Sequence, residues 1–238
     1  MKANDIFFQD LDVFRLKLNT DQIEKFDCFY DILLSENKKF NLTSITERYD
    51  VYKKHFIDSL SLCTYDIDLS GDIHIIDIGT GAGFPGIPLK IVFPHLKITL
   101  VDSLNKRISF LEDVICKLNL SDIIPIHGRA EDLAQNSFHR EKYDLCVSRA
   151  VANLSTLTEY CLPFVKPGGL FIAYKAEVST EVSDAQNCIC LLGGKLDKQL
   201  TFDLPNSDIS RSLVGVKKIS ITPIKYPRRA GLPGKKPL

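Results

Sequence analysis

The chain has 238 residues, of which 45% are hydrophobic and 25% charged, the composition of an ordinary globular protein. A chain of this length can bury a core without disulfides or structural metals, and this composition excludes disordered, collagen-like and coiled-coil chains. The formal net charge is zero, but eight basic residues and no acid follow Asp208, so an acidic body carries a basic tail. That asymmetry fits either a polyanionic partner or a tail that is simply solvated.

The sequence also predicts the compartment. No apolar run approaches the ~20 residues of a membrane span, and the N-terminal segment carries acids where a secretory signal has a basic start and an apolar core. The seven cysteines are scattered and form no CxxC pair, which leaves zinc and redox motifs without support. We therefore expect a cytoplasmic protein with reduced thiols, no metal and no membrane contact.

Residues 1–70 are predicted to form a helical N-terminal cap. Within residues 21–40, aromatic and leucine side chains recur at helical spacing, and a second helix is predicted over 46–62. The polar segment 41–44 separates the two helices.

From residue 73, predicted strands and helices alternate. Strands are expected at 74–79, 97–102, 122–128, 143–149, 168–176, 194–204 and 212–222, and helices at 84–93, 104–120 and 178–191. This alternation favours right-handed crossovers and a mostly parallel sheet, while the last two strands favour an antiparallel hairpin with 212–222 at the edge. The predicted fold is a three-layer Rossmann-like α/β domain over 71–222, followed by a basic tail over 223–238.

A glycine-rich turn, DIGTGAGFPG, directly follows the first predicted strand. Glycines there let the backbone turn tightly and approach a ligand closely. Gly81, Gly83 and Gly86 fit the dinucleotide fingerprint GxGxxG. The alternative frame, Asp77 followed by Gly79, Gly81 and Gly83, resembles the first motif of S-adenosylmethionine methyltransferases, in which an acid suits the ammonium group of the cofactor.

Two further strand ends extend this candidate site. A carboxylate at Asp102 can accept both hydroxyls of a ribose, whichever of the two cofactors is bound. In methyltransferase folds the loop after the third strand holds the adenine, which makes Ala130 and Glu131 candidates. The alternative for Glu131 is a helix N-terminus stabilised by an acid.

The fourth strand is followed by Ser-Arg-Ala at 148–150, where methyltransferases of this class place the substrate. The chain has neither an Asn/Asp-Pro-Pro-aromatic loop nor a Pro-Cys pair, the devices used for amino and cytosine-C5 methylation. Guanine N7 already carries a free lone pair and needs neither, so positioning would dominate catalysis. Arg129 and Arg149 could donate to guanine O6 or to a phosphate, although Arg149 could instead form a structural ion pair. His55 and His127 are weaker candidates as general bases.

Together these segments resemble one family. DIGTGAGFPGIPL, LVDSLNKRISFL, GRAED and VSRAVA, with KKFNLTSI and HFIDSL before them and YPRRAGLPGKKPL after them, are similar to the small-subunit ribosomal RNA methyltransferase G family, also called glucose-inhibited division protein B. The resemblance spans roughly residues 37–238. It implies an S-adenosyl-L-methionine-dependent enzyme that methylates N7 of a guanine in 16S rRNA, acting on free rRNA or on the small ribosomal subunit. We expect a monomer.

The resemblance also assigns roles to residues. Cofactor contacts are implied for Gly79, Phe84, Asp102, Ser103, Leu104, Ala130, Glu131 and Arg149. RNA contacts are implied for Asn41, Thr43, Lys106, Arg107, Arg129 and Lys175. Arg129 and Arg149 are the expected catalytic residues, so Arg149 is assigned to both cofactor and substrate, while His55 and Asp58 are expected to orient other groups.

Two other functions remain open at this point. A methyltransferase acting on a small molecule or a protein would not need the basic tail and would not methylate rRNA. A nucleotide-binding regulator would use the GxGxxG frame and bind NAD, although Phe84 and Pro85 inside that frame argue against it.

Overall fold

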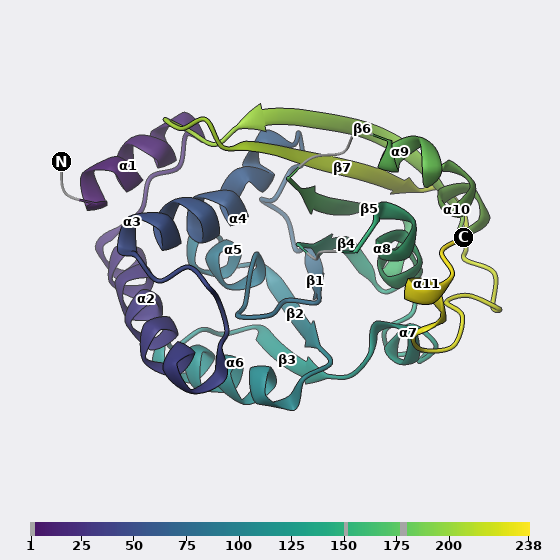
Figure 1. Ribbon diagram of the computed structural model, residues 1–238, viewed down its shortest axis with the longest axis horizontal. Coiled ribbons are helices and arrows are strands. Elements are labelled where there is room, and N and C mark those ends of the chain that lie inside the picture. The colour runs from purple at the N-terminus through teal and green to yellow at the C-terminus, as the bar shows by residue number, and fades with distance from the viewer. Residues whose placement is uncertain (1–2, 150–151, 177–179) are drawn as a thin grey trace.

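The computed structural model describes residues 3–149, 152–176 and 180–238 (Figure 1). The predicted mostly parallel sheet with an antiparallel hairpin at one edge is confirmed: the described residues form a seven-stranded sheet in the order β3-β2-β1-β4-β5-β7-β6. Its strands are β1 (His74–Ile78), β2 (Lys97–Asp102), β3 (Ile123–His127), β4 (Tyr143–Ser148), β5 (Val165–Lys175), β6 (Gly194–Asp203) and β7 (Ser210–Lys218).

The strand order reverses at β1. This strand pairs in parallel with β2 on one side and with β4 on the other. β3 and β5 extend the two halves in parallel, whereas β7 is antiparallel to both β5 and β6. In open α/β sheets such a switch point leaves a crevice beyond the carboxyl ends of the strands, so the fold itself marks the place of a ligand site.

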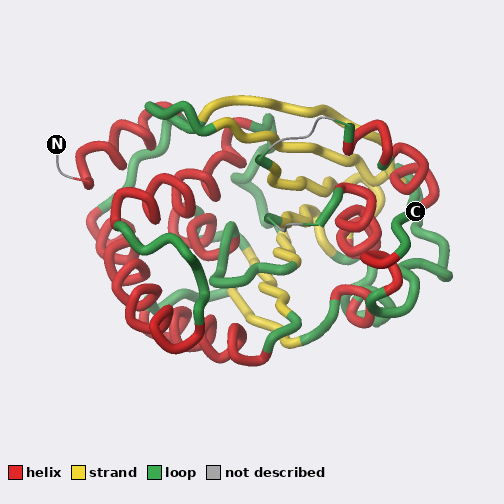
Figure 2. Tube along the Cα trace, viewed as in Figure 1, coloured by secondary structure: helices red, strands yellow, loops and turns green. Residues whose placement is uncertain are grey.

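Helices cover both faces of the sheet, which gives the predicted three layers (Figures 1 and 2). The helical elements are α1 (Ala3–Val13), α2 (Thr20–Phe40), α3 (Arg48–Val51), the π-helix η1 (Tyr52–Ile57), α4 (Asp58–Leu60), the 3-10 turn η2 (Ser61–Thr64), α5 (Gly86–Val92), α6 (Asn105–Lys117), α7 (Ala130–Leu133), α8 (Leu154–Cys161), the 3-10 turn η3 (Leu162–Phe164), α9 (Glu181–Asp184), α10 (Gln186–Leu191) and α11 (Leu232–Lys235). No helix in the described ranges is both long and apolar enough to cross a membrane.

Alternate residues of the central strands pack into two separate hydrophobic cores. Ile75 of β1 packs among residues of α1, α2, α5 and α6, whereas its neighbour Ile76 packs among residues of α8 and α10. Successive side chains of a strand point to opposite faces, and a sheet covered on both faces buries both sets. This two-sided burial explains why residues 75–78 are all buried and, apart from Asp77, all apolar.

The helix α2 is fixed at its start and along one face. Asn19 caps it, since its side chain accepts from the Gln22 N–H while the Gln22 side chain accepts from the Asn19 N–H. The Gln22 amide also donates to the carbonyls of Ile91 and Val92, which joins α2 to α5. Phe29 is fully buried and packs against the rings of Phe56 and Phe84.

Three predicted elements differ from the observed ones. The helix predicted over 46–62 is a helical run over 48–64 that contains the π-helix. The helix predicted over 178–191 is two short helices, α9 and α10, and residues 177–179 lie outside the described ranges. The strand predicted over 212–222 ends at Lys218, and it is wrong as an edge strand, because β7 lies between β5 and β6.

Candidate active site

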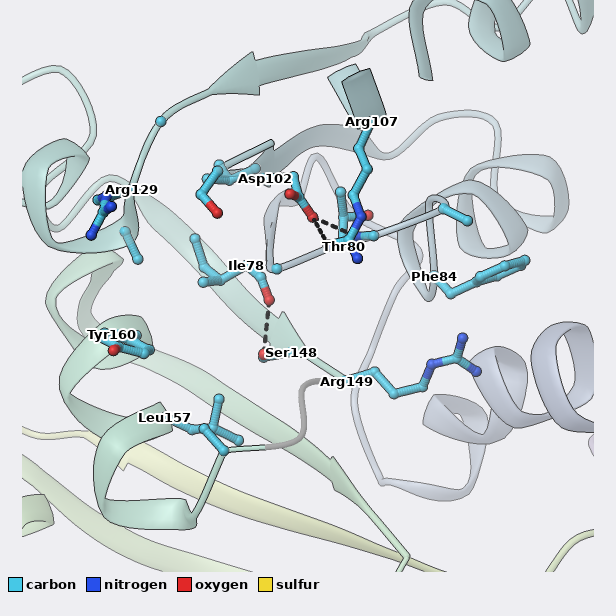
Figure 3. A pocket seen from close by; sticks show the side chains of 18 of the residues that line it. Ile78, Thr80, Phe84, Asp102, Arg107, Arg129, Ser148, Arg149, Leu157 and Tyr160 are labelled. Carbon is cyan, nitrogen blue, oxygen red and sulfur yellow. Dashed lines mark hydrogen bonds and ion pairs between the residues drawn. The ribbon is translucent and has the colours of Figure 1, made fainter. Parts of the chain in front are cut away.

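A cavity of about 740 Å³ lies at the carboxyl ends of β1, β2 and β4, a volume typical of small-molecule sites. Figure 3 shows side chains that line it, with Phe84 and Arg149 at one end, Arg129, Leu157 and Tyr160 at the other, and Asp102 between them. Ser148 donates its hydroxyl to the Ile78 carbonyl at 2.8 Å, which joins the ends of β4 and β1 at the switch point.

The glycine-rich turn forms one wall of this cavity. Gly81 has a φ of +62°, and a Cβ built there would meet only the Gly79 carbonyl oxygen, at 4.0 Å, so the backbone angle rather than packing favours glycine. Gly83, with a φ of +92°, faces the other way: a Cβ there would lie 2.4 Å from Cδ1 of Ile87. Gly83 therefore packs the turn against α5 and does not line the cavity.

Asp77 lies beneath the turn rather than in the cavity. Its side chain is fully buried, and Oδ2 accepts from the Thr80 hydroxyl at 2.7 Å and from the Gly86 N–H at 2.9 Å. Oδ1 has no hydrogen-bond partner among the described residues. Burial raises the pKa of Asp77 to about 7. The acid thus organises the turn, and because it takes the Gly86 N–H, the start of α5 is not free for a pyrophosphate, which weighs against the dinucleotide alternative.

Asp102 joins the glycine turn to α6. Its Oδ1 accepts from the Leu104 N–H at 2.9 Å, and its Oδ2 accepts from the Gly81 N–H and from Nη1 of Arg107, both at 3.0 Å (Figure 3). The carboxylate is 3% exposed and lines the cavity. Arg107, predicted to contact RNA, thus lies at the cavity and is paired with Asp102.

The π-helix holds Arg149. Nη1 donates to the Lys54 carbonyl at 3.1 Å and to Oδ2 of Asp58 at 3.0 Å, and Nη2 contacts Nδ1 of His55 at 3.3 Å. The guanidinium carbon lies 4.9 Å from the centre of the Phe84 ring, within the range of a cation–π contact. The ion pair considered from the sequence therefore exists, and it leaves Arg149 on the cavity wall.

These contacts define the protonation state of His55. Arginine can only donate, so Nδ1 of His55 accepts from Arg149 and Nε2 carries the proton. Nε2 then donates to the Thr43 hydroxyl at 2.8 Å, which in turn accepts from the Ile45 N–H. Burial, followed by the charge of Arg149, lowers the pKa of His55 to about 3. The ring stacks on Phe84 with centroids 4.7 Å apart, so His55 is a neutral, fully engaged group.

Arg129 and Glu131 belong to the other end of the cavity. The Arg129 side chain makes no hydrogen bond or ion pair with the residues that the structure describes, whereas Glu131 is 7% exposed and accepts from the Gly231 N–H at 2.7 Å. Ala130 and Tyr160 also line this end.

At the Arg149 end of the cavity, Asp58 additionally accepts from Nε of Arg211 at 2.9 Å, so one carboxylate links Arg149 to β7.

The cavity brings together most of the predicted site residues: Thr43, Gly79, Gly81, Phe84, Asp102, Ser103, Arg107, Arg129, Ala130, Glu131 and Arg149. The others lie outside its lining. Asn41 ends α2, and Lys106 donates to the Phe40 carbonyl at 3.3 Å. The side chain of Lys175 is 8% exposed, and its ammonium pairs with Glu181 at 2.6 Å. His127 contacts the Ser103 carbonyl and does not line the cavity; Ala150 lies outside the described residues.

Sequence reasoning did not find several lining residues, among them Leu42, Thr80, Leu157, Tyr160 and Gly231. Leu157 and Tyr160 come from α8. The sequence feature that could have predicted the start of this helix is Asn153, whose side chain accepts from the Thr156 N–H as a helix cap. No group of three or more metal-ligating side chains occurs in the described part of the chain.

The residues present fit a nucleoside joined to an amino acid. The open space above Gly81 lets a ligand approach the backbone, and the Asp102 carboxylate beside it is an acceptor for hydroxyl groups.

Solved structures share this architecture. A chain of the Haloferax volcanii complex between the methyltransferase activator Trm112 and a methyltransferase superposes with a TM-score of 0.58 at 11% identity, covering 80% of this chain and 98% of that one. The CurJ carbon methyltransferase gives a TM-score of 0.52 at 13% identity, covering 72% and 57%. At these identities the likeness shows the fold alone, which is the α/β fold of methyltransferases.

Sequence comparison identifies the family. The model of the family described as rRNA small subunit methyltransferase G matches residues 22–207. The proteins called ribosomal RNA small subunit methyltransferase G in Lachnoclostridium phytofermentans and Acetivibrio thermocellus are 50% and 48% identical to this chain, covering 100% of it and 98% of each relative. The chain belongs to the rRNA small subunit methyltransferase G family. The predicted rRNA methyltransferase is thereby confirmed over a small-molecule or protein methyltransferase.

Proposed function

We propose that this enzyme transfers the methyl group of S-adenosyl-L-methionine to N7 of a guanine in 16S rRNA, presented as rRNA or as the small ribosomal subunit. The observation that carries the proposal is the cavity at the switch point, which the Asp102 carboxylate, the glycine turn with Phe84, and Arg149 line together.

The cofactor would be held by groups that already define the cavity. Asp102 would accept from its ribose hydroxyls, the turn at Gly79 and Gly81 would follow its amino-acid part, and Ala130 and Glu131 would contact its base. When bound, S-adenosylmethionine supplies a methyl group activated by an adjoining sulfonium. Because Arg107 already donates to Asp102, it would share the carboxylate with the ribose or turn toward RNA phosphates.

The neutral, fully hydrogen-bonded ring of His55 supports a substrate nucleophile that needs no general base. Both ring nitrogens are engaged, one by Thr43 and the other by Arg149, and the low pKa keeps the ring neutral. Guanine N7 attacks through a lone pair in the plane of its ring and loses no proton. Catalysis would then rest on holding N7 in line with the methyl group, for which a rigid Arg149–His55–Asp58 cluster is suited.

Arg149 and Arg129 would act on the guanine and its backbone. Arginine presents five N–H donors, and the contacts of Arg149 with Lys54, Asp58 and His55 leave donors over for guanine O6. Arg129, whose charge is not paired with a described acid, is suited to a phosphate. Lys106 and Asn41, near the cavity but outside its lining, remain proposals for RNA contact.

The test is to incubate the full chain with methyl-labelled S-adenosylmethionine and small subunits that lack the modification, and in parallel with deproteinised 16S rRNA. The rRNA is digested and the labelled nucleoside identified. We expect 7-methylguanosine at one position. Label on another base would overturn the N7 assignment, and no label on either RNA from a protein that binds S-adenosylhomocysteine would overturn the RNA substrate.

Variants can distinguish whether Arg149 contacts the guanine or the cofactor. If it contacts guanine, Arg149→Ala lowers the methylation rate by about 100-fold or more, the loss of a charge-assisted hydrogen bond of ~3 kcal/mol, and leaves the affinity for S-adenosylhomocysteine within about twofold. A parallel loss of affinity would assign it to the cofactor instead. Lys166→Ala is the matched control, because this lysine pairs with Asp144 away from the cavity.

A further inference from the structure

The C-terminal segment 226–235 is fastened to the domain rather than left in solvent. Figure 1 shows it, in yellow, running beside α7 and α8, and α11 packs against α8. The Arg140 guanidinium donates to the carbonyls of Thr222 at 2.7 Å and Tyr226 at 2.8 Å. Tyr226 is buried in the core formed with α8 and α10.

The strongest anchor is an ion pair inside this contact. Glu159 of α8 is 1% exposed at its side chain and accepts from Arg228 through the backbone N–H at 2.8 Å, Nε at 2.9 Å and Nη2 at 2.6 Å. Two-pronged arginine–carboxylate pairs fix geometry as well as charge. Breaking such a pair leaves an uncompensated buried carboxylate. Arg228 is thus used to hold the segment, whereas its neighbour Arg229 is exposed.

Beyond this anchor the segment reaches the cavity. Gly231 lines it, and the Gly231 N–H donates to Oε1 of Glu131, itself a lining residue. Two residues further on, the Pro233 carbonyl accepts from the Thr156 hydroxyl at 3.2 Å. The segment therefore fixes the orientation of Glu131 and closes the cavity beside Tyr160.

The end that it closes has the chemistry of a nucleobase site. Figure 3 shows Leu157, Tyr160 and Arg129 at the opposite end from Phe84 and Arg149. Leu157 and Ala130 offer apolar surface to a flat ring, and Glu131 offers an acceptor to an exocyclic amino group.

We infer that residues 226–235 form a wall of the cofactor's nucleobase subsite, and that Arg228 and Glu159 are positioning residues for cofactor binding. The inference rests on the proposed cofactor. The basic tail then has a role other than phosphate binding. Arg228 pairs with Glu159, so removing Arg228 should lower the affinity for the cofactor rather than the affinity for RNA.

The experiment compares Arg228→Ala with Arg229→Ala in the full chain, two neighbouring changes that remove the same charge. Titration calorimetry measures the affinity for S-adenosylhomocysteine and for 5′-methylthioadenosine, which keeps the nucleoside but lacks the amino-acid part. Arg228→Ala should weaken both ligands by the same factor, tenfold or more, whereas Arg229→Ala should leave both within twofold. In methylation assays, Arg228→Ala should raise the KM for S-adenosylmethionine and leave kcat at saturation nearly unchanged, a split that general destabilisation would not produce.

The outcomes separate the inference from the proposed function. If the parent chain fails to bind S-adenosylhomocysteine, the cofactor proposal fails and the inference fails with it. If the parent binds and folded Arg228→Ala binds equally well, only the inference is overturned. Arg228→Lys, which keeps the charge but not the two-pronged pair, serves if Arg228→Ala does not fold; it should weaken both ligands by a smaller common factor, and unchanged affinity would overturn the inference.

Discussion

The buried carboxyl of Asp77 should make the stability of the enzyme depend on pH in an unusual direction. Its pKa rises from 3.8 to about 7 because burial disfavours the charged form. Between these values the unfolded chain has lost the proton and the folded protein keeps it, so stability falls as pH rises from about 4 to 7. At 1.36 kcal/mol per pKa unit, the cost of ionising Asp77 in the folded protein is on the order of 4 kcal/mol above pH 7.

Asp77→Asn isolates this effect. The amide oxygen can still accept from Thr80 and Gly86, while the amide nitrogen would take the position of Oδ1, which has no partner among the described residues. An unpartnered buried donor costs about 1–3 kcal/mol, so at pH 8 we expect a net gain on the order of 1–3 kcal/mol.

The assay is urea unfolding of both proteins at steps from pH 4 to pH 8. The quantity of interest is the difference in free energy of unfolding between variant and parent, because other titrating groups cancel in it. It should change by on the order of 4 kcal/mol in favour of the variant across that range. Parallel curves for the two proteins would refute the reasoning and mean that Asp77 is ionised in the folded protein near its ordinary pKa.

Three other expectations follow from single contacts. Lys53→Met should lower the free energy of unfolding by about 3–5 kcal/mol, because it leaves the buried Asp10 without its cation, and adding Asp10→Asn should recover part of that loss; urea unfolding of the single and double variants tests both statements. Gly86→Ala should cost about 1–3 kcal/mol by the same measurement, because the new Cβ would lie 2.3 Å from Cδ2 of the buried Leu100, and an unchanged midpoint would contradict this. The folded pKa of His55, about 3, lies below its ordinary 6.5, so its neutral form contributes stability that is present above pH 6.5 and is lost on acidification toward pH 3; His55→Gln should flatten that loss, and an equal loss in both proteins would contradict it.

The parallel core of the fold could be predicted from sequence because two-sided burial leaves largely apolar runs, such as residues 75–78, in which Asp77 is the one polar residue. The position of β7 could not be read from turns and hairpin order alone. Its run at 213–216 is buried on both faces, the pattern of a central strand, whereas β6 beyond Gly194 alternates between exposed and partly buried residues as an edge strand does. The burial pattern of β7, rather than its position in the chain, indicates its place in the sheet.

The residues of the candidate site likewise include some that the sequence could predict and some that it could not. Residues at strand ends, such as Asp102 and Arg149, follow from topology, since parallel strands bring their carboxyl ends to one edge. Asp77 occupies the predicted motif but lies under the turn, where its carboxylate accepts from the Thr80 hydroxyl and the Gly86 N–H. Tyr160 and Gly231 meet in the cavity through contacts between distant segments, among them the Arg228–Glu159 pair, which local spacing does not encode.

The π-helix at 52–57 has a consequence for how this enzyme can vary. A π turn is an α-helix that has gained one residue, and here the widened turn carries both the Lys54 carbonyl and the His55 ring to Arg149. Removing one residue would restore an ordinary helix, and the change would fall on the turn that carries the Lys54 carbonyl and the His55 ring. Lys54 and His55 would then no longer be presented to Arg149 together. The length of this segment is therefore fixed by the contacts that its widened turn makes with Arg149.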